Sequence, residues 1–353
     1  MKIDLFTPPK FKKQFLNINK LNTDTNKKWN YASYGRISLY HILKPLNIDK
    51  ILVPIYICST ILEPLKKLNI KPIFYDLEIE DLNASLESID YLSRKHNVTT
   101  VLIASMYGNP ANMFEIEKYC KENNIFMIDD AAQSFGSKLN HKDVGTFGNA
   151  GFFSFSPGKP TAGHMGSFYW SDINSEIIRT KNCFAHYVRW LFFYLTRYKV
   201  YETPSFVKKI VTLLYLFTDK YINLYNDNIC EFEKSILGGI LNEKYEFRQK
   251  YHNKFVKKFS SNIYFKVIKS LRGNPNNHKF VICCNTEDIA KKFIAHMNKK
   301  NICVLNGYTL LSSNLENLKN AKIIEKKIVE MPIEDCHKRM NYLFTKVEEF
   351  NAS

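Results

Sequence analysis

Residues 128–136, IDDAAQSFG, and residues 144–159, VGTFGNAGFFSFSPGK, decide the fold of this 353-residue chain. The apolar run IFMID, at 125–129, leads into the first stretch, and AGFFSF, at 150–155, lies within the second. Both runs are short, uninterrupted and rich in β-branched or aromatic residues, which indicates strands buried on both faces. Polar residues follow each run, at the sheet edge where ligands bind in open α/β folds.

The same pattern continues outward over residues 30–175. Four more apolar runs predict strands: ILVP (51–54), KPIFYD (71–76), TTVLIAS (99–105) and GSFYW (166–170). Stretches with apolar residues every three or four positions predict helices: RISLYHILKPL (36–46), STILEPLKKL (59–68) and MFEIEKYCKEN (113–123). This alternation predicts an α/β fold whose mainly parallel sheet has helices on both faces.

The chain exceeds the roughly 250–300 residues that one hydrophobic core supports, so we expect two domains. A large domain is predicted over residues 1–228, with a helical, aromatic and basic segment at about 175–228. A small C-terminal α/β domain is predicted over residues 229–353. Its elements are a long helix at 231–259, strands near 278–284, 302–307 and 328–333, and helices at 287–300 and 335–350.

The chain carries 50 Lys and Arg against 34 Asp and Glu, a formal net charge of +16. These basic residues occur singly or in pairs, without the clustered patch of a nucleic-acid-binding module, so no nucleic-acid partner is expected. Eight cysteines without a CxxC pair, and the absence of a signal-peptide pattern, favour a reduced, cytoplasmic protein without a metal site. No stretch approaches the roughly 20 apolar residues that span a bilayer, so any membrane contact should be peripheral.

The nucleotide-binding motifs of α/β folds do not fit this chain. No GxGxxG follows a predicted strand, and the P-loop-like SPGKPT has Phe153 at the first glycine position and Pro160 in place of Ser or Thr. Taken alone, Asp130 could be a helix N-cap. The ordered combination of Asp130, Gln133 one helical turn on, and the SFSPGK segment is more specific than any of its parts.

This combination resembles the DegT/DnrJ/EryC1/StrS family of PLP-dependent sugar aminotransferases, a branch of fold-type I. Weaker matches extend over nearly the whole chain, in YGRISLYHIL (34–43), VPIYIC (53–58), KPIFYDLEIEDL (71–82), YGNPANMFEIEKYC (107–120) and MPI (331–333). The resemblance implies the fold-type I transferase fold and pyridoxal 5'-phosphate (PLP) as cofactor. It also implies amino transfer, with glutamate as the expected donor, to a keto sugar that we expect to be nucleotide-linked, in surface-glycan or amino-sugar biosynthesis.

The resemblance assigns three residues to the reactive part of the cofactor. Lys159 matches the lysine that forms the Schiff base and later carries protons. Asp130 matches the aspartate that keeps the pyridine nitrogen protonated, because a neighbouring negative charge favours the protonated ring. Gln133 would face the phenolic oxygen. Lys159 and Asp130 are therefore the predicted catalytic residues.

The phosphate is expected at the start of the helix in YGRISLYHIL, where free N–H groups bind anions. Gly35, Arg36 and Ile37 occupy that turn, and most relatives carry Thr where Arg36 stands. Ser154 matches a serine or threonine that also touches the phosphate; the alternative is an ordinary strand hydroxyl.

Three further residues are candidates with open alternatives. Tyr56 could stack on the cofactor ring or pack in the core. Asn226 could correspond to an asparagine that reaches the phosphate of the neighbouring subunit. His164 lies in GHMGS, where relatives have an acidic glycine-rich stretch, and it could line the substrate cleft or lie in a solvated loop.

The aromatic, basic segment 183–217 could pack on a partner subunit, cover the active site or rest on a membrane. Packing on a partner agrees with the homodimer and shared active site that the resemblance implies. Two other classes of function stay open: a PLP-dependent sugar dehydratase or catalytically altered relative, and a non-enzymatic basic protein that binds nucleic acid or a membrane surface.

Overall fold

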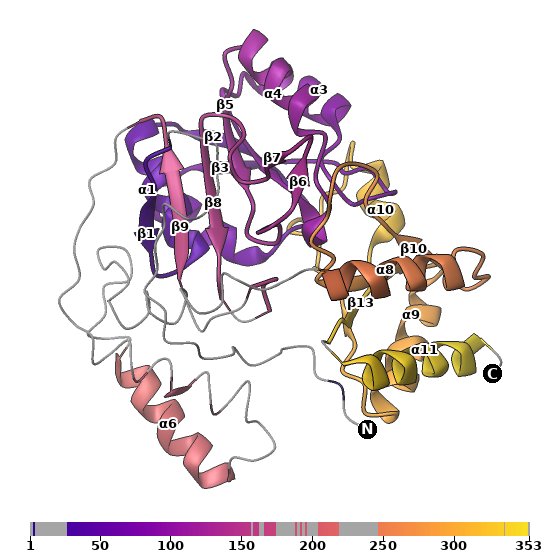
Figure 1. Cartoon of the computed structure of the whole chain (residues 1–353). Helices are drawn as coiled ribbons and strands as arrows, with labels where there is room; N and C mark the ends of the chain where they lie inside the picture. The colour runs from indigo at the N-terminus through magenta and orange to yellow at the C-terminus, as the bar shows by residue number, and fades with distance from the viewer. Residues whose placement is uncertain are drawn as a thin grey trace.

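The computed structural model describes residues 27–156, 158–161, 166–173, 204–218, 246–334 and 336–351, with residues 3, 188, 191, 192 and 195. Figure 1 shows a large sheet with its helices and, beside it, a smaller group formed by the C-terminal elements. The boundary that we predicted near residue 228 falls outside the described residues, so it stays a prediction.

The large sheet has seven strands in the order β1-β9-β8-β5-β4-β2-β3. Their bounds are β1 (Asn30–Ala32), β2 (Lys50–Pro54), β3 (Lys71–Tyr75), β4 (Thr100–Ala104), β5 (Phe126–Asp130), β8 (Ala150–Ser154) and β9 (Ser167–Ser171). Strands β3, β2, β4, β5 and β8 are parallel neighbours, and β9 runs antiparallel to β8 and β1. The six predicted strands and the mainly parallel sheet are confirmed.

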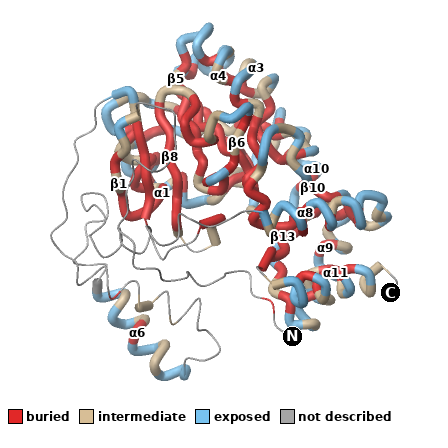
Figure 2. Tube along the Cα trace, viewed as in Figure 1, coloured by how far each residue is buried: buried red, intermediate tan, exposed pale blue. Residues whose placement is uncertain are grey.

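Helices cover both faces of this sheet. Alternating residues of β2 divide between two cores: Ile51 and Val53 pack on the side of α1 (Gly35–Leu43) and α2 (Leu62–Lys67), and Leu52 packs on the opposite side. That opposite side is covered by α3 (Leu86–His96) and α4 (Met113–Glu122). Figure 2 shows the strands between these layers buried along most of their length.

The C-terminal domain contains a four-stranded antiparallel sheet in the order β10-β11-β13-β12. Its strands are β10 (Phe265–Ile268), β11 (Lys279–Cys284), β12 (Leu305–Asn306) and β13 (Ile328–Pro332), and its helices are α8 (Glu246–Phe259), α9 (Glu287–Lys299), α10 (Lys319–Ile324) and α11 (His337–Asn351). Stacked and edge-on rings of Phe255, Phe280 and Phe344 hold α8, β11 and α11 together.

Several short elements complete the described chain. They are the 3-10 turns η2 (Lys44–Leu46), η3 (Ser59–Ile61) and η4 (Met106–Gly108), the hairpin of β6 (Lys138–Leu139) and β7 (Lys142–Asp143), and helix α6 (Ser205–Thr218). Helix α6 is the described part of the predicted helical segment at about 175–228, and it lies apart from both sheets (Figure 1). Within the described ranges, no helix is both long and apolar enough to cross a membrane.

Candidate active site

A cavity of about 390 Å³ lies where the two domains meet. The large domain lines it with the start of α1, the segment after β2 and the ends of β4, β5 and β8. The C-terminal domain contributes Lys279, Glu330 and residues 305–308. The cavity therefore lies at the carboxyl ends of parallel strands, where ligands bind in open α/β sheets, and a second domain covers it.

Asp130 ends β5 and lines the cavity, with only 5% of its surface exposed. Its Oδ1 accepts a hydrogen bond from the backbone N–H of Ala132 at 2.9 Å, and no other described residue donates to its carboxylate. Burial raises the pKa of Asp130 to about 6. The segment after Asp130 forms successive turns, so the N-cap alternative and the helical turn expected between Asp130 and Gln133 were both wrong.

The neighbouring Asp129 points away from the cavity. Its Oδ2 accepts backbone hydrogen bonds from Gly145 at 2.6 Å and Phe147 at 3.1 Å. Because successive side chains of a strand point to opposite faces, only one of the two aspartates can reach the cavity. Asp130 is the one that lines the cavity, and the carboxylate of Asp129 holds the loop before β8 through its two backbone hydrogen bonds.

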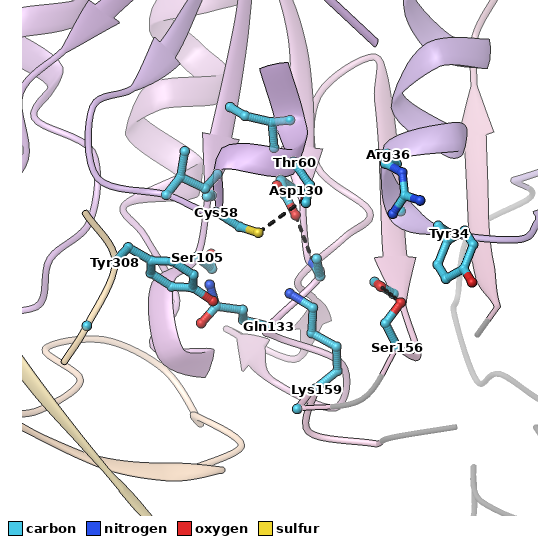
Figure 3. Close-up of a pocket in the computed structure, with 18 of the residues that line it drawn as sticks. Tyr34, Arg36, Cys58, Thr60, Ser105, Asp130, Gln133, Ser156, Lys159 and Tyr308 are labelled. Carbon is cyan, nitrogen blue, oxygen red and sulfur yellow. Dashed lines mark hydrogen bonds between the residues drawn. The ribbon is translucent and has the colours of Figure 1, made fainter. Parts of the chain in front are cut away.

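Lys159 follows β8 and lines the same cavity as Asp130. Figure 3 shows its side chain extending into the cavity toward the side on which Asp130 lies. Burial lowers the pKa of the Lys159 ammonium, and the nearby Cys58 and Asp130 oppose that shift. A lysine with a lowered pKa loses its proton more readily, as a nucleophile and proton carrier must.

Gln133 also lines the cavity, and its amide is held in place. Its Oε1 accepts a hydrogen bond from the backbone N–H of Tyr107 at 3.1 Å, which links the turn after β5 to the turn after β4. The structure thus brings together Asp130, Gln133 and Lys159, three residues that the sequence predicted to act at one site.

Gly35, Arg36 and Ser154 meet at one end of the cavity. A Cβ at Gly35 would lie 3.2 Å from the Cβ of Ser154, so a side chain there would crowd the cavity wall. The Ser154 hydroxyl donates to the Oγ of Ser156 at 3.3 Å, and Arg36 Nε lies 2.9 Å from Oε2 of Glu63. The arrangement agrees with the predicted phosphate end, where the first amides of α1 lack acceptors within the helix.

Ile37 was predicted to join this end of the site, and its position does not support that prediction. Its backbone N–H donates to the carbonyl of Tyr34 at 2.9 Å, its side chain is fully buried, and it is not among the cavity-lining residues. Because this N–H is already hydrogen-bonded within the first turn of α1, it is not available to a phosphate. Only Gly35 and Arg36 of the predicted three line the cavity.

Tyr56 lies in the core, which is the second of its two alternatives. It is 2% exposed and does not line the cavity, and its hydroxyl contacts the hydroxyl of Tyr107 at 2.7 Å and accepts from the N–H of Tyr308 at 3.1 Å. The short segment after β2 brings Cys58 to the cavity instead, with its Sγ 3.2 Å from Oγ1 of Thr60. His164 and Asn226 lie outside the described residues.

Sequence reasoning missed the C-terminal half of the site. Lys279, Tyr308 and Glu330 line the cavity from β11, the segment after β12, and β13. They stand more than 100 residues beyond Lys159 and form no recognisable motif. A buried lysine at the start of an apolar strand, in HKFVICC, was the one signal that could have pointed to them.

The seven-stranded, mainly parallel sheet with its covering helices and smaller C-terminal domain is the fold of the fold-type I PLP-dependent transferases. The solved structure of Helicobacter pylori PseC, an aminotransferase of pseudoaminic acid biosynthesis, matches over 100% of both chains with a TM-score of 0.75 and 13% identity. The E. coli GDP-4-keto-6-deoxy-D-mannose-3-dehydratase with bound hydrated PLP matches with a TM-score of 0.66 and 20% identity, over 91% of this chain and 87% of that chain.

The sequence matches are shorter than the structural ones. Residues 38–177 match the model of the DegT/DnrJ/EryC1/StrS aminotransferase family, and the resemblance predicted from the sequence is confirmed. The GDP-perosamine synthase of Escherichia coli O157:H7 is 30% identical over 167 residues, 46% of this chain and 44% of that protein. The chain therefore matches less than half the length of this curated relative.

Proposed function

We propose that the protein is a PLP-dependent aminotransferase that transfers an amino group, with glutamate as the expected donor, to a nucleotide-linked keto sugar. The observation that carries this proposal is the convergence of Lys159, Asp130 and the start of α1 on one cavity. The family match and the likeness to an enzyme of nucleotide-sugar amination, GDP-perosamine synthase, support the reaction and the substrate class.

The residues in the cavity fit PLP at each of its polar groups. Asp130 has one carboxylate oxygen that no described donor uses, which suits a protonated pyridine nitrogen. Gln133 would lie beside the phenolic oxygen. Gly35, Arg36 and Ser154 would hold the phosphate, and the narrow space at Gly35 agrees with a close approach of backbone to an anion.

Bound PLP supplies an aldehyde that links covalently to amines and an electron-withdrawing ring that weakens the bonds of the amine-bearing carbon. The chain supplies the proton transfers. Lys159 Nζ, lowered in pKa by burial, takes the proton from the amine-bearing carbon of the donor and later returns one to the sugar. Asp130 would lie beside the pyridine nitrogen, where its negative charge would favour the protonated ring.

Reduction with borohydride tests the proposal. We expect the protein to purify yellow, to lose this colour on reduction, and to yield a pyridoxyl group on the peptide that contains Lys159. The Lys159→Ala variant serves as the control and should bind PLP without a covalent link. A label on another lysine, or a protein that stays colourless after PLP is added, would refute the assignment.

Product analysis distinguishes an aminotransferase from a sugar dehydratase. The dehydratase is the alternative to test because the fold is also similar to that of the E. coli dehydratase. The presence of Lys159 at the position of the Schiff-base lysine favours amination. With glutamate and a 4-keto sugar nucleotide, we expect nitrogen in the sugar product and 2-oxoglutarate in equal amount. A product that has lost an oxygen and gained no nitrogen would identify a dehydratase.

The site is further proposed to be shared by the two subunits of a homodimer, with Asn226 reaching the cofactor of the neighbouring subunit. The family resemblance supports this assembly. Cytoplasmic location is also a proposal, and six free cysteines among the described residues agree with a reducing compartment.

A further inference from the structure

A buried ion pair forms part of the cavity wall that the C-terminal domain contributes. Lys279 of β11 and Glu330 of β13 both line the cavity, and the ammonium of Lys279 donates to Oε2 of Glu330. The two side chains are only 9% and 7% exposed. Buried charges of this kind are costly unless they are paired, so their presence at a ligand cavity points to a role in binding.

A chain of two tyrosine hydroxyls holds the carboxylate of Glu330 in place. Oε1 of Glu330 accepts a hydrogen bond from the Tyr107 hydroxyl at 2.7 Å, and that hydroxyl contacts the hydroxyl of Tyr56 at 2.7 Å. Both carboxylate oxygens of Glu330 are therefore used by protein donors. The result is a lysine ammonium that is fixed at the cavity wall by an anchored carboxylate.

Lys279 has donors to spare. An ammonium group carries three N–H bonds, and Glu330 is the one acceptor that the described residues offer to Lys279. Two N–H groups at the wall of a cavity favour a ligand with oxygen acceptors, because an unsatisfied buried donor is unfavourable.

The other cations of the cavity have different partners or tasks. Among the described lining residues, Arg36, Lys159 and Lys279 are the basic ones. Arg36 stands at the start of α1 beside Glu63, and Lys159 is required for the chemistry. Lys279 thus remains as the cation available to an anionic group close to Lys159.

We propose that Lys279 binds the α-carboxylate of the amino donor. The inference rests on the proposed function and identifies a residue that selects its donor. The carboxyl carbon of an amino acid and its amine nitrogen are bonded to the same carbon and lie about 2.5 Å apart. A donor whose amine reaches Lys159 therefore carries its carboxylate to a nearby cation.

Two observations favour the donor over the sugar nucleotide as the source of this anion. The charges of Lys279 and Glu330 both act on the pKa of Lys159, that of Lys279 lowering it and that of Glu330 raising it, so the pair lies close to Lys159. The diphosphate of a nucleotide sugar is separated from the keto carbon by the sugar ring, so it would lie farther from Lys159 than an α-carboxylate.

The test compares each donor with its decarboxylated amine. The L-amino acid that most rapidly converts the chromophore of the wild-type holoenzyme is chosen from a panel, and its amine lacking the α-carboxylate is measured beside it. For Lys279→Met we expect apparent affinity for the amino acid to fall about 10- to 100-fold, the scale of one charge-assisted hydrogen bond, and affinity for the amine to stay unchanged. Lys279→Arg should retain part of the discrimination.

Calorimetry provides a second readout that does not depend on turnover. The hydroxy acid that matches the donor keeps the carboxylate but cannot transfer an amine, and its Kd should rise about 10- to 100-fold in Lys279→Met. Lys266→Met, on neighbouring strand β10 with a side chain 60% exposed, is the matched control and should bind like wild type. If Lys279→Met does not fold because Glu330 loses its partner, the double variant with Glu330→Gln takes its place.

The outcomes distinguish this inference from the proposed function. Unchanged donor discrimination together with a raised KM for the keto sugar would overturn the inference and leave the aminotransferase intact. Equal losses for the amino acid and its amine would also overturn it. A wild-type protein that never forms a chromophore with PLP would refute the proposed function, and the inference would fall with it.

Discussion

Asp129 and Asp130 show how one position along a strand separates a carboxylate that binds a loop from one that lines the cavity. Burial raises the pKa of both, to about 7 for Asp129 and about 6 for Asp130. Two backbone N–H groups oppose the shift at Asp129, whereas one does so at Asp130, where Lys159 adds its positive charge. The carboxylate with fewer protein partners is the one that faces the cavity.

We expect Asp130→Asn to fold normally and to transaminate about 100-fold or more slowly, the scale of removing one preorganised electrostatic partner. An amide cannot hold the pyridine nitrogen protonated. Gln133→Ala should have a milder effect. Steady-state kinetics measures both variants, and near-normal turnover of Asp130→Asn would remove Asp130 from the site. Asp129 could not replace it, because its carboxylate faces the loop of Gly145 and Phe147.

The raised pKa of Asp130 also predicts a pH dependence of cofactor binding. Below about pH 6 its carboxyl is protonated in the apoprotein and loses the charge that attracts the pyridine nitrogen. We expect affinity for PLP to fall as the pH drops through 6, by about tenfold per unit. Fluorescence titration of wild type and Asp130→Asn measures this, since the variant keeps the titrations of PLP and Lys159 and lacks only that of Asp130. Parallel profiles would contradict the prediction.

The same shift affects stability in the opposite direction. The folded pKa of Asp130, about 6, lies above its ordinary value of 3.8, so the folded apoprotein binds more protons than the unfolded chain between these values. The contribution of Asp130 therefore makes the apoprotein less stable as the pH rises through this window. Bound PLP should reverse this trend at Asp130, because its protonated ring favours the ionised carboxylate.

At the scale of elements, the loop between β7 and β8 joins strand β5 to strand β9. The N–H of Gly145 donates to Asp129 at the end of β5, and its carbonyl accepts from Nε1 of Trp170 in β9 at 2.7 Å. Its φ of +101° lies in the region that favours glycine. The loop that leads into β8, and so toward Lys159, is thereby fixed to β5, which carries Asp130, and to β9.

We expect Gly145→Ala to lower the free energy of unfolding by about 2–4 kcal/mol, from backbone strain and overpacking together. A Cβ at Gly145 would lie 2.5 Å from the ring of Phe153. Urea denaturation measures the loss. Asn140→Gly, at an exposed turn position with φ of +47°, is the control and should change stability by less than about 0.5 kcal/mol. Equal stability of Gly145→Ala and wild type would show that the loop adapts.

At the scale of the whole molecule, helix α6 presents large apolar side chains to solvent. Phe206, Ile210 and Leu213 are 64%, 53% and 68% exposed. The ring of Phe192 stacks on Tyr215 of the same helix, with centroids 4.2 Å apart, so the segment also packs on itself. An apolar surface of this kind is typical of an interaction site, and a second subunit fits the proposed shared site.

We expect a homodimer at micromolar concentration in analytical ultracentrifugation. The exposed positions Phe206 and Leu213 are the ones to change: Phe206→Asp and Leu213→Asp should shift the equilibrium toward monomer and weaken cofactor binding in parallel. Lys209→Asp, on the same helix, is the control for charge alone. A stable monomer that binds PLP as tightly as the dimer would refute the shared site and would favour the membrane alternative for this segment.

The sequence by itself determined the large sheet and identified the residues of the proposed reactive centre. The strands around Asp130 and Lys159 are local apolar runs, and the chemistry of PLP fixes which residue types must follow them. Strands β1 and β10 and helix α10 were missed, since elements of three to six residues leave little periodic signal. Helix α3 was missed although its apolar residues Leu86, Ile89 and Leu92 recur at helical spacing. The expected helix after Asp130 was wrong because hydrogen bonds of Asp130 and Gln133 stabilise turns there.

Only the tertiary structure decided what faces the cavity. The choice between stacking and core packing at Tyr56 depended on Tyr107 and Tyr308, which lie 51 and 252 residues away along the chain. Lys279 and Glu330 became part of the site because paired strands of a second domain bring them to the cavity. The sequence around either residue contains no motif that indicates this position. Side-chain periodicity reports which face of an element is buried, but the partner that it meets is set by how the domains pack.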